Sequence, residues 1–330
     1  MTSPRAEERA SERPERWTAL LNPAAGRGRA TARLARVTDA IAAADLDVAL
    51  HVTTDADDLR RAARHAFDHG RGVLACGGDG TVGMVAGLAA ELDGVLGIVA
   101  TGSGNDLARH LGLPRGNPAA AVRVVAGGVV TRVDLGRAET DAPHHVEWFT
   151  TVANTGFDAE ANRWANARTR LTGTPLYVTA VLRTLRTYRP RAVRLTVDGV
   201  VTETDAWLVA MANTRSYASG MIIAPAASMH DGLLDVCVVG PVSRAEFLRT
   251  FPGVFRGAHV RNRAVLMLRG RDVTIEALDA SLELWASGER VGPLPARVRA
   301  VPGALRVMVV GPQTADPTAP CPSATCPSAT

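Results

Sequence analysis

Two glycine-rich turns in this sequence have the composition of phosphate-binding loops. Residues 77–81 read GGDGT and residues 102–106 read GSGND, and each turn joins a short apolar run to the start of a helical pattern. Without a Cβ atom, glycine lets backbone N–H groups approach an anion, and the N-terminus of a following helix adds partial positive charge. Both turns are therefore predicted to bind phosphate oxygens. For each, a tight strand-to-helix turn without a ligand is the alternative.

Polar side chains in these turns suggest further roles. Asp79 places a carboxylate beside the predicted phosphates, where it could hold Mg²⁺ or orient an attacking hydroxyl. Thr81 is a suitable N-cap for the helix that follows. A third turn, NPAAGRG at residues 22–28, follows the first apolar run. Arg27 within it would either meet phosphate oxygens or be a solvated arginine at a helix start, and both interpretations stay open.

The elements that must position these turns alternate between residues 17 and 131. Short apolar runs at 18–22, 48–53, 72–76 and 95–100 are separated by helical patterns at 29–44, 56–69, 81–91 and 106–111. This alternation predicts an α/β domain with a doubly wound parallel sheet. Such sheets bind phosphate-bearing ligands at the carboxyl ends of their strands, which is where the three turns fall.

After residue 131 the apolar pattern changes to a period of two, which predicts an antiparallel, β-rich domain over 132–311. Its expected strands are 146–154, 193–197, 206–212, 233–239, 264–268, 273–277, 282–285 and 305–309, with helical insertions at 175–187 and 244–255. The last strands could return to the first domain. Residues 1–16 and 312–330 have the composition of disordered segments.

Composition excludes several classes of protein. With 330 residues, 46% of them hydrophobic, the chain has enough apolar residues for about two globular domains. A formal net charge of +4 is too small to indicate nucleic acid as a partner. Only Cys76 and Cys237 lie outside the tail, so no disulfide framework or zinc site follows. Because no signal peptide or membrane-spanning run is present, we expect a cytoplasmic protein, with contact at the inner membrane face as its only route to a bilayer.

Several ordered motifs resemble the diacylglycerol kinase catalytic-domain family, which includes sphingosine, ceramide and bacterial lipid kinases. Besides the three turns, they are NTGFDAEA at 154–161, SGMIIAPAASMHDGLLDV at 219–236 and SGERV at 287–291. The resemblance covers about residues 17–310. GGDGT alone also resembles NAD kinases and phosphofructokinases, but NPxxGxG and GxxNDLAR favour the lipid kinases.

The resemblance implies an ATP- and Mg²⁺-dependent lipid kinase and roles for individual residues. Asp231 would bind a structural Mg²⁺ with backbone carbonyls near Ser228 and Leu233, although an Asp-Gly turn without metal is the alternative. Thr54 is an alternative to Thr53 in the nucleotide site. The nucleotide-binding positions would be Asn22, Thr53, Gly77, Gly78, Asp79, Gly80, Thr81, Gly102, Ser103, Asn105 and Asp106.

The sequence departs from the family at its expected general base. Where relatives have Asp-Gly-Glu, this chain has Ser287, Gly288 and Glu289, so the usual carboxylate is missing. A serine hydroxyl does not accept a proton near neutral pH. Asp79, Ser287 and Glu289 are nevertheless the residues that we place at the chemistry. Three explanations stay open: a slow or specialised kinase, a kinase for an altered acceptor, and a catalytically silent protein.

The predicted reaction is phosphorylation of a hydroxyl on a diacylglycerol, long-chain base or similar apolar alcohol. An NAD kinase-like enzyme and a nucleotide- or lipid-binding regulator are the alternatives. Phe247, Phe251 and Phe255 repeat at four-residue spacing among arginines. This stripe would either dock on an anionic membrane or, as is more usual for such a stripe, face the core. A homodimer is left open.

Overall fold

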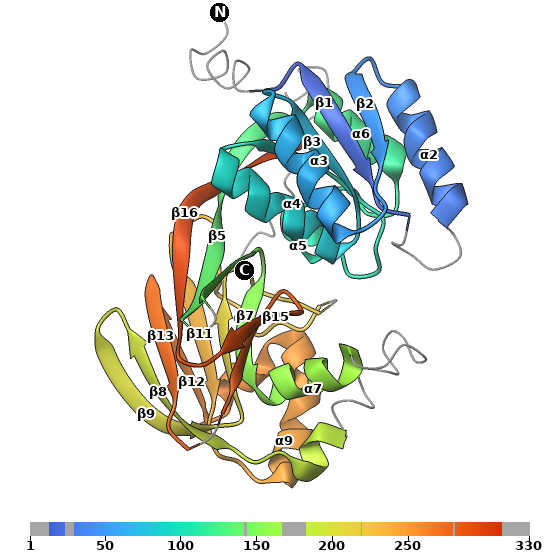
Figure 1. Cartoon of the computed structure of the whole chain (residues 1–330). Helices are drawn as coiled ribbons and strands as arrows, with labels where there is room; N and C mark the ends of the chain where they lie inside the picture. Colours follow the sequence, from blue (N-terminus) through green and yellow to red (C-terminus); the bar gives the residue numbers. More distant parts are fainter. Residues whose placement is uncertain are drawn as a thin grey trace, which may run out of the picture.

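Four parallel strands form the centre of the N-terminal half, in the order β2-β1-β3-β4. The computed structural model describes residues 13–23, 30–141, 144–166, 183–218, 220–279 and 281–311. Helices α3 and α4 pack on one face of these strands, while α2 and α6 cover the other (Figure 1). The doubly wound arrangement predicted from the sequence is thus confirmed. The elements are β1 (Arg16–Leu21), α2 (Ala30–Ala42), β2 (Asp47–Val52), α3 (Ala56–Asp68), β3 (Gly72–Gly77), α4 (Asp79–Leu92), β4 (Val95–Ala100), α5 (Asp106–His110) and α6 (Pro118–Gly127).

Residue alternation along the strands separates the two cores of this half. Leu20 and Val73 face α3 and α4, whereas Trp17 and Leu74 face α2 and α6, and all four are buried. Strands that are apolar on both faces are typical of a parallel sheet covered by helices on both sides. This burial fixes the sheet and therefore the positions of the turns at its carboxyl edge.

Two long strands, β5 (Val129–Asp141) and β16 (Ala296–Val309), carry the sheet into the C-terminal half (Figure 1). β16 pairs in parallel with β4 and antiparallel with β5, so the last described strand does return to the first domain. The resulting ten-stranded sheet continues through β13 (Asp272–Ala277), β8 (Arg191–Val197) and β9 (Val200–Ala206), with β6 (His144–Phe149) beside β5. Residue 131, the expected domain boundary, lies within β5.

A second, antiparallel sheet packs against the lower part of the first one. Its order is β12-β11-β10-β7-β14-β15, and Phe149, Val236 and Ile275 contribute to the buried core between the sheets. Its strands are β7 (Val152–Gly156), β10 (Leu208–Ala212), β11 (Leu234–Val239), β12 (Val265–Gly270), β14 (Glu283–Ala286) and β15 (Glu289–Pro293). Helices pack on its other face, among them α7 (Phe157–Asn166), α9 (Arg244–Thr250), and the 3₁₀ helices η1 (Phe251–Arg256) and η2 (Ala258–Arg261). The expected β-rich, antiparallel region is confirmed.

Several local expectations were wrong. α4 begins at Asp79 with Gly78 as its N-cap, so Thr81 lies in the first turn and does not cap the helix. The expected strand 146–154 is divided into β6 and β7. α9 ends before Pro252, which lacks a backbone N–H and cannot continue an α-helix. By contrast, the expected helix 175–187 is confirmed at 183–187, and its earlier part lies outside the described ranges, within residues 167–182.

No helix within the described ranges is both long enough and apolar enough to cross a bilayer.

Candidate active site

The two glycine turns meet at the carboxyl edge of the parallel strands. β3 and β4 are neighbours with Gly77 opposite Ala100, and Thr101 donates its N–H to the Gly77 carbonyl at 2.9 Å. A Cβ atom on Gly102 would lie 2.5 Å from the Cα atom of Gly78. No real Cβ approaches a backbone atom so closely, so glycine is required at this contact. The predicted convergence of the turns is therefore present.

Asp79 fixes the second turn through its carboxylate. Its two oxygens accept the backbone N–H groups of Asn105 at 2.8 Å and Asp106 at 2.6 Å. Asn105 adopts a left-handed conformation, with φ of 53°, and its side chain exchanges two hydrogen bonds with the backbone of Gly102. Asn and Asp tolerate that conformation better than other non-glycine residues. These contacts hold the second turn against the start of α4.

The N-terminus of α4 is suited to an anion. Its N-cap residue is Gly78, which provides no side-chain capping bond. No N-cap side chain therefore covers the first backbone N–H groups of this 14-residue helix. Gly80 has nothing within 4 Å of an ideal Cβ position, and Ser103 is exposed, so the two turns border open space.

Polar residues from the neighbouring strand ends support this edge. Asn22, just after β1, donates from its side-chain amide to Thr81 Oγ1 at 3.0 Å. Thr53, just after β2, is buried and donates its hydroxyl to the Leu21 carbonyl at 3.2 Å. Thr54 is exposed and its hydroxyl bonds to Asp55 instead. Residues 24–29 of the third turn, including Arg27, lie outside the described ranges.

Helix α5 joins these turns to the C-terminal half. Arg109 pairs with Asp106 at 2.9 Å and donates to the carbonyl of Gly104 at 3.0 Å. His110 contacts the backbone oxygen of Ser216 through Nε2 at 2.9 Å. Burial lowers the pKa of His110, partly offset by that hydrogen bond. The loop that contains Ser216 is thereby held beside α5 and the second glycine turn.

The same loop leads to an apolar cavity of about 60 Å³ between the second sheet and its helical cover. Tyr217, in its wall, donates its hydroxyl to the buried carboxylate of Asp158 at 3.0 Å, and Asn154 donates to the same oxygen at 2.9 Å. Phe247 and Phe251 also line the cavity, whereas Phe255 is exposed. The phenylalanine stripe therefore has two rings on the cavity and one at the surface. Sequence reasoning missed Tyr217 and Asp158, although NTGFDAEA contained the aspartate.

Ser287 lies at the tip of the β14–β15 hairpin. Both tip residues have positive φ, 49° at Ser287 and 87° at Gly288, as in a type I′ turn. The Ser287 N–H donates to the Val152 carbonyl at 3.0 Å, and its hydroxyl lies 3.4 Å from that of Thr151. Asn and Asp are favoured at such a first turn position. The expected aspartate would therefore fit this backbone.

Glu289 is exposed at the start of β15. Burial raises the pKa of Glu147 on β6, and the charge of Glu289 adds to that rise. No hydrogen bond or ion pair among the described residues joins Ser287 or Glu289 to Asp79. The structure thus places the three expected catalytic residues on two separate elements without direct contact.

The expected metal position already has a cationic partner. The Asp231 carboxylate accepts the Leu233 N–H at 3.0 Å and pairs with Arg269, which also lies 3.6 Å from Asp235. Ser228 accepts the N–H of His230 at 3.3 Å. A Mg²⁺ ion at Asp231 would compete with a guanidinium for one carboxylate, so this arrangement does not by itself fit the metal. No group of three or more His, Cys, Asp or Glu side chains suited to a metal occurs in the described ranges.

Asp134 is a buried carboxylate that the motifs did not reveal. It accepts the N–H of Gly232 at 2.7 Å and that of Gly303 at 2.8 Å. One carboxylate thus joins β5 to the loop of Asp231 and to the bulge in β16. No local signal marks it in the sequence, because its partners are far away along the chain.

The fold and these turns define an α/β protein whose glycine turns meet at the carboxyl edge of its parallel strands, with an attached β-sandwich. The chain belongs to the diacylglycerol kinase family of lipid kinases. The diacylglycerol kinase catalytic domain model matches residues 16–138, and the model of the YegS C-terminal NAD kinase beta sandwich-like domain matches residues 151–309.

Individual relatives agree with this membership. A diacylglycerol kinase of Mycobacterium tuberculosis is 40% identical over 296 residues, covering 88% of this chain and 94% of the relative. A diacylglycerol kinase of Bacillus subtilis is 28% identical over 283 residues, covering 84% and 90%. The crystal structure of a putative diacylglycerol kinase from Bacillus anthracis has a TM-score of 0.74 at 23% identity, covering 90% of this chain and 98% of that one, which supports the fold.

Proposed function

We propose that this protein transfers the terminal phosphoryl group of ATP to a hydroxyl of a lipid, a diacylglycerol or a related apolar alcohol. The backbone contact between Gly78 and Gly102 carries the proposal, because it brings two anion-binding turns together at the carboxyl edge of the sheet. Family membership supports kinase chemistry. The names of the relatives support diacylglycerol as the first acceptor to test.

The triphosphate would bind where α4 begins. Backbone N–H groups of Gly80 and of the Ser103 turn would meet its oxygens, with the α4 N-terminus adding partial positive charge. Asn22 and Thr53 would support the same edge. Mg²⁺, when bound with ATP, supplies charge neutralisation at the phosphate oxygens.

Asp79 has a positioning role in this arrangement. Both of its oxygens accept hydrogen bonds from the second turn, so its carboxylate maintains the phosphate-binding geometry. Phosphoryl transfer depends mainly on positioning and charge stabilisation. A proton-accepting role for Asp79 is compatible with the remaining lone pairs, since each carboxylate oxygen can accept more than one hydrogen bond.

The apolar cavity is the proposed site for an acyl chain. It is lined mainly by apolar side chains, and Asp158 and Tyr217 add polar atoms at its wall. The contact between His110 and Ser216 links α5 to the loop that leads to this wall. A lipid hydroxyl held near that loop would approach the phosphate-binding edge.

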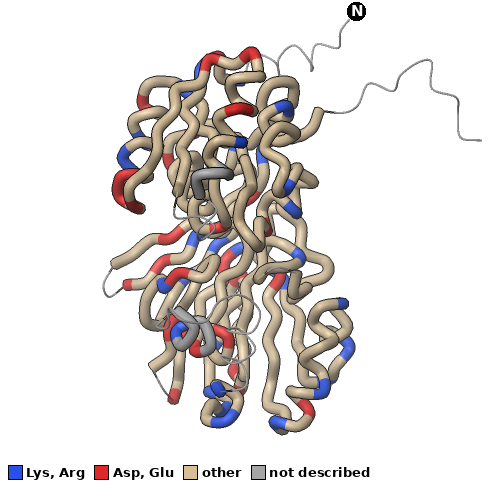
Figure 2. The backbone as a smooth tube through the Cα atoms, turned by 90° about the vertical axis from the view of Figure 1, so that its right-hand side faces the viewer, with Lys and Arg blue, Asp and Glu red and all other residues tan. Residues whose placement is uncertain are grey.

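The α9–η1 segment is the proposed point of membrane contact. Leu248 and Phe255 expose apolar side chains there, and Arg249 and Arg256 are exposed beside them. Apolar groups flanked by arginines are suited to the surface of an anionic bilayer. Figure 2 shows further Arg positions along the lower half of this side of the molecule. A homodimer stays a prediction.

A second candidate is a nucleotide- or lipid-binding regulator, which Ser287 favours by removing the expected base. To separate the candidates, full-length protein is incubated with labelled ATP and Mg²⁺ and a panel of diacylglycerols, long-chain bases, polyprenols and NAD. Transfer to an apolar alcohol supports the kinase. Transfer to NAD alone supports the NAD kinase-like alternative, and ATP binding without any transfer supports the regulator.

A further inference from the structure

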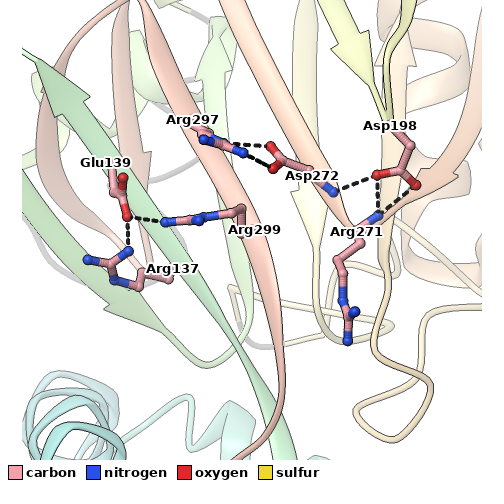
Figure 3. A network of polar contacts seen from close by, with 7 residues as sticks. All are labelled: Arg137, Glu139, Asp198, Arg271, Asp272, Arg297 and Arg299. Carbon is pink, nitrogen blue, oxygen red and sulfur yellow. Dashed lines mark hydrogen bonds and ion pairs between the residues drawn. The ribbon is translucent and has the colours of Figure 1, made fainter.

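Besides the apolar cavity on the second sheet, the structure has a concavity on the first sheet. It lies on the same face as α4, beyond the part of the sheet that this helix covers. It has a volume of about 540 Å³, and three arginines from separate elements line it: Arg137 of β5, Arg299 of β16 and Arg271 between β12 and β13. Trp148 and two carboxylates, Asp198 and Asp272, line it as well. Figure 3 shows these arginines with the carboxylates around them.

The concavity lies near the end of α4 that is remote from the glycine turns. An ideal Cβ on Gly87 would lie 3.1 Å from Trp148, and Arg137 interacts electrostatically with Glu91 in the last turn of α4. Asp79, at the other end, begins the helix. Glu91 lies twelve positions after Asp79, which corresponds to roughly 18 Å of helix. The concavity is therefore distinct from the proposed nucleotide site.

Strand register brings two like charges face to face. Arg137 is directly opposite Arg299, with Trp148 opposite Arg137 on the other side. Like charges at directly opposed positions destabilise a sheet. The planar guanidinium of Arg137 lies 5.9 Å from the Trp148 ring centre, which favours its present orientation. Natural sheets keep such pairs where another requirement outweighs their cost.

The nearby carboxylates do not balance these arginines one to one. Glu139 pairs with both Arg137 and Arg299, so two guanidinium groups share one carboxylate (Figure 3). Asp272 accepts hydrogen bonds from Arg297. Asp272 lines the concavity, whereas Arg297 does not. Among the side chains that line the concavity, three guanidinium groups face two carboxylates, and Arg297 engages one of those two.

Arg271 adds the third guanidinium. Asp198 accepts the backbone N–H groups of Arg271 and Asp272 at 2.9 to 3.0 Å. The Arg271 guanidinium itself has no carboxylate partner in the described ranges. Burial and the charge of Arg299 both lower the pKa of Arg137, while the charge of Glu91 opposes them.

We propose that Arg137, Arg271 and Arg299 form a second anion site that binds a phosphomonoester group. Guanidinium groups donate in a planar fork that matches phosphate oxygens, and three of them suit a dianion. Binding would relieve the repulsion between Arg137 and Arg299. A soluble phosphomonoester and the headgroup of a phosphatidate lipid share this chemistry. The proposal does not depend on nucleotide binding at the glycine turns.

Isothermal titration of inorganic phosphate into the full-length protein tests the site. Arg271→Gln and Arg299→Gln are each expected to weaken the phosphate affinity by about tenfold to a hundredfold, the usual cost of a lost charge-assisted contact. Arg194→Gln is the matched control, because Arg194 is paired with Glu203 and Glu276 and does not line the concavity. Its affinity for phosphate should equal that of the wild type. Any phosphate bound at the glycine turns is the same background in all four proteins.

Co-sedimentation with phosphatidylcholine vesicles, with and without phosphatidate, distinguishes the two sources. Sedimentation that needs phosphatidate and is lost in Arg271→Gln indicates a lipid headgroup, and calorimetric binding without such sedimentation indicates a soluble phosphate. Unfolding temperatures identify any variant that fails to fold. If Arg299→Gln does not fold, Arg271→Gln alone tests the proposal. Arg271 is exposed and its guanidinium makes no ion pair with the described residues, so this variant is expected to fold. Wild-type behaviour of Arg271→Gln in both assays overturns the proposal.

Discussion

The backbones of Gly78 and Gly102 touch across two turns that are separate in the sequence. A Cβ atom added to Gly102 would lie 2.5 Å from the Cα atom of Gly78, and one added to Gly78 would lie 3.3 Å from the Cα atom of Gly102. Because the neighbouring atoms belong to the backbone, they cannot rotate away. The two turns therefore form one surface only while residue 102 stays glycine.

Gly102→Ala is expected to weaken ATP binding by about tenfold or more, since overpacking of this kind costs about 1 to 3 kcal/mol and separates the turns. Titration calorimetry with ATP measures the effect. Gly127→Ala is the control, because nothing lies within 4 Å of its Cβ position in α6 and alanine favours a helix. Equal ATP affinity in the two variants would show that the contact does not shape a nucleotide site.

Ser287→Asp is expected to raise turnover, by about 10² to 10⁴ if it restores a general base. Ser287→Asn is the control for the turn itself, because Asn and Asp both suit the positive φ of 49° but only Asp has a carboxylate. Both variants should unfold at a higher temperature than the wild type. Steady-state kinetics measure the turnover of both variants. If Ser287→Asp turns over no faster than Ser287→Asn, the general base lies elsewhere.

Local patterns predicted the sheet well because strand and helix periods are recorded in adjacent residues. The runs that became β1 to β4 and the helices between them were recognised in this way, and so were the glycine turns. Pairing over long sequence distances is not recorded locally. The return of the last strands to the first domain could be suspected, but the parallel pairing of Arg306 with Val95 could not be located. β5 and α6 were missed, although Asn117 before Pro118 is a typical N-cap signal for α6.

The candidate site was only partly predictable for the same reason. A motif identifies residues such as Asp79, but not that its carboxylate accepts N–H groups from the second turn. Thr81 was expected as an N-cap because its type suits that position, yet the helix begins earlier and Thr81 accepts a bond from Asn22. Propensity describes a residue alone, whereas the site depends on its partners.

Val254 tests the proposed acyl site, because it is buried in η1 and lines the apolar cavity. Val254→Phe should fill the cavity and raise the KM for long-chain diacylglycerol, while the KM for ATP stays unchanged. Val254→Ala should enlarge the cavity and leave long-chain substrates accepted. Kinetics with short- and long-chain diacylglycerols measure both. If the KM for long-chain diacylglycerol changes in the same way in both variants, the acyl chain binds elsewhere.

Arg269 tests the metal prediction at Asp231. Because Arg269 occupies that carboxylate, Arg269→Met should increase the affinity for Mg²⁺ and make the unfolding temperature depend on Mg²⁺. Asp231→Asn in the same background should remove both effects. Calorimetric titration with Mg²⁺ and thermal unfolding with and without a chelator provide the measurements. If Arg269→Met binds Mg²⁺ no better than the wild type, Asp231 is not a metal ligand in this chain.

His110 predicts a dependence of stability on pH. Burial lowers its pKa, and the charges of Arg109 and Arg215 lower it further, while the bond to Ser216 and the charge of Asp106 oppose them. The unfolded chain therefore binds more protons than the folded chain just below the ordinary pKa of histidine, about 6.5. The contribution of neutral His110 to the free energy of unfolding is therefore fully present above that pH and is lost as the pH falls below it.

The unfolding temperature should decrease between pH 7.5 and 5.5, and His110→Gln should make this decrease smaller. Burial also lowers the pKa of His259. His259 therefore accounts for part of the pH dependence that remains in His110→Gln. The exposed His230 provides the control, since His230→Gln should keep the full pH dependence. Scanning calorimetry over this pH range measures all three proteins. An unchanged slope in His110→Gln would mean that protonation of His110 does not weaken the α5 contact with Ser216.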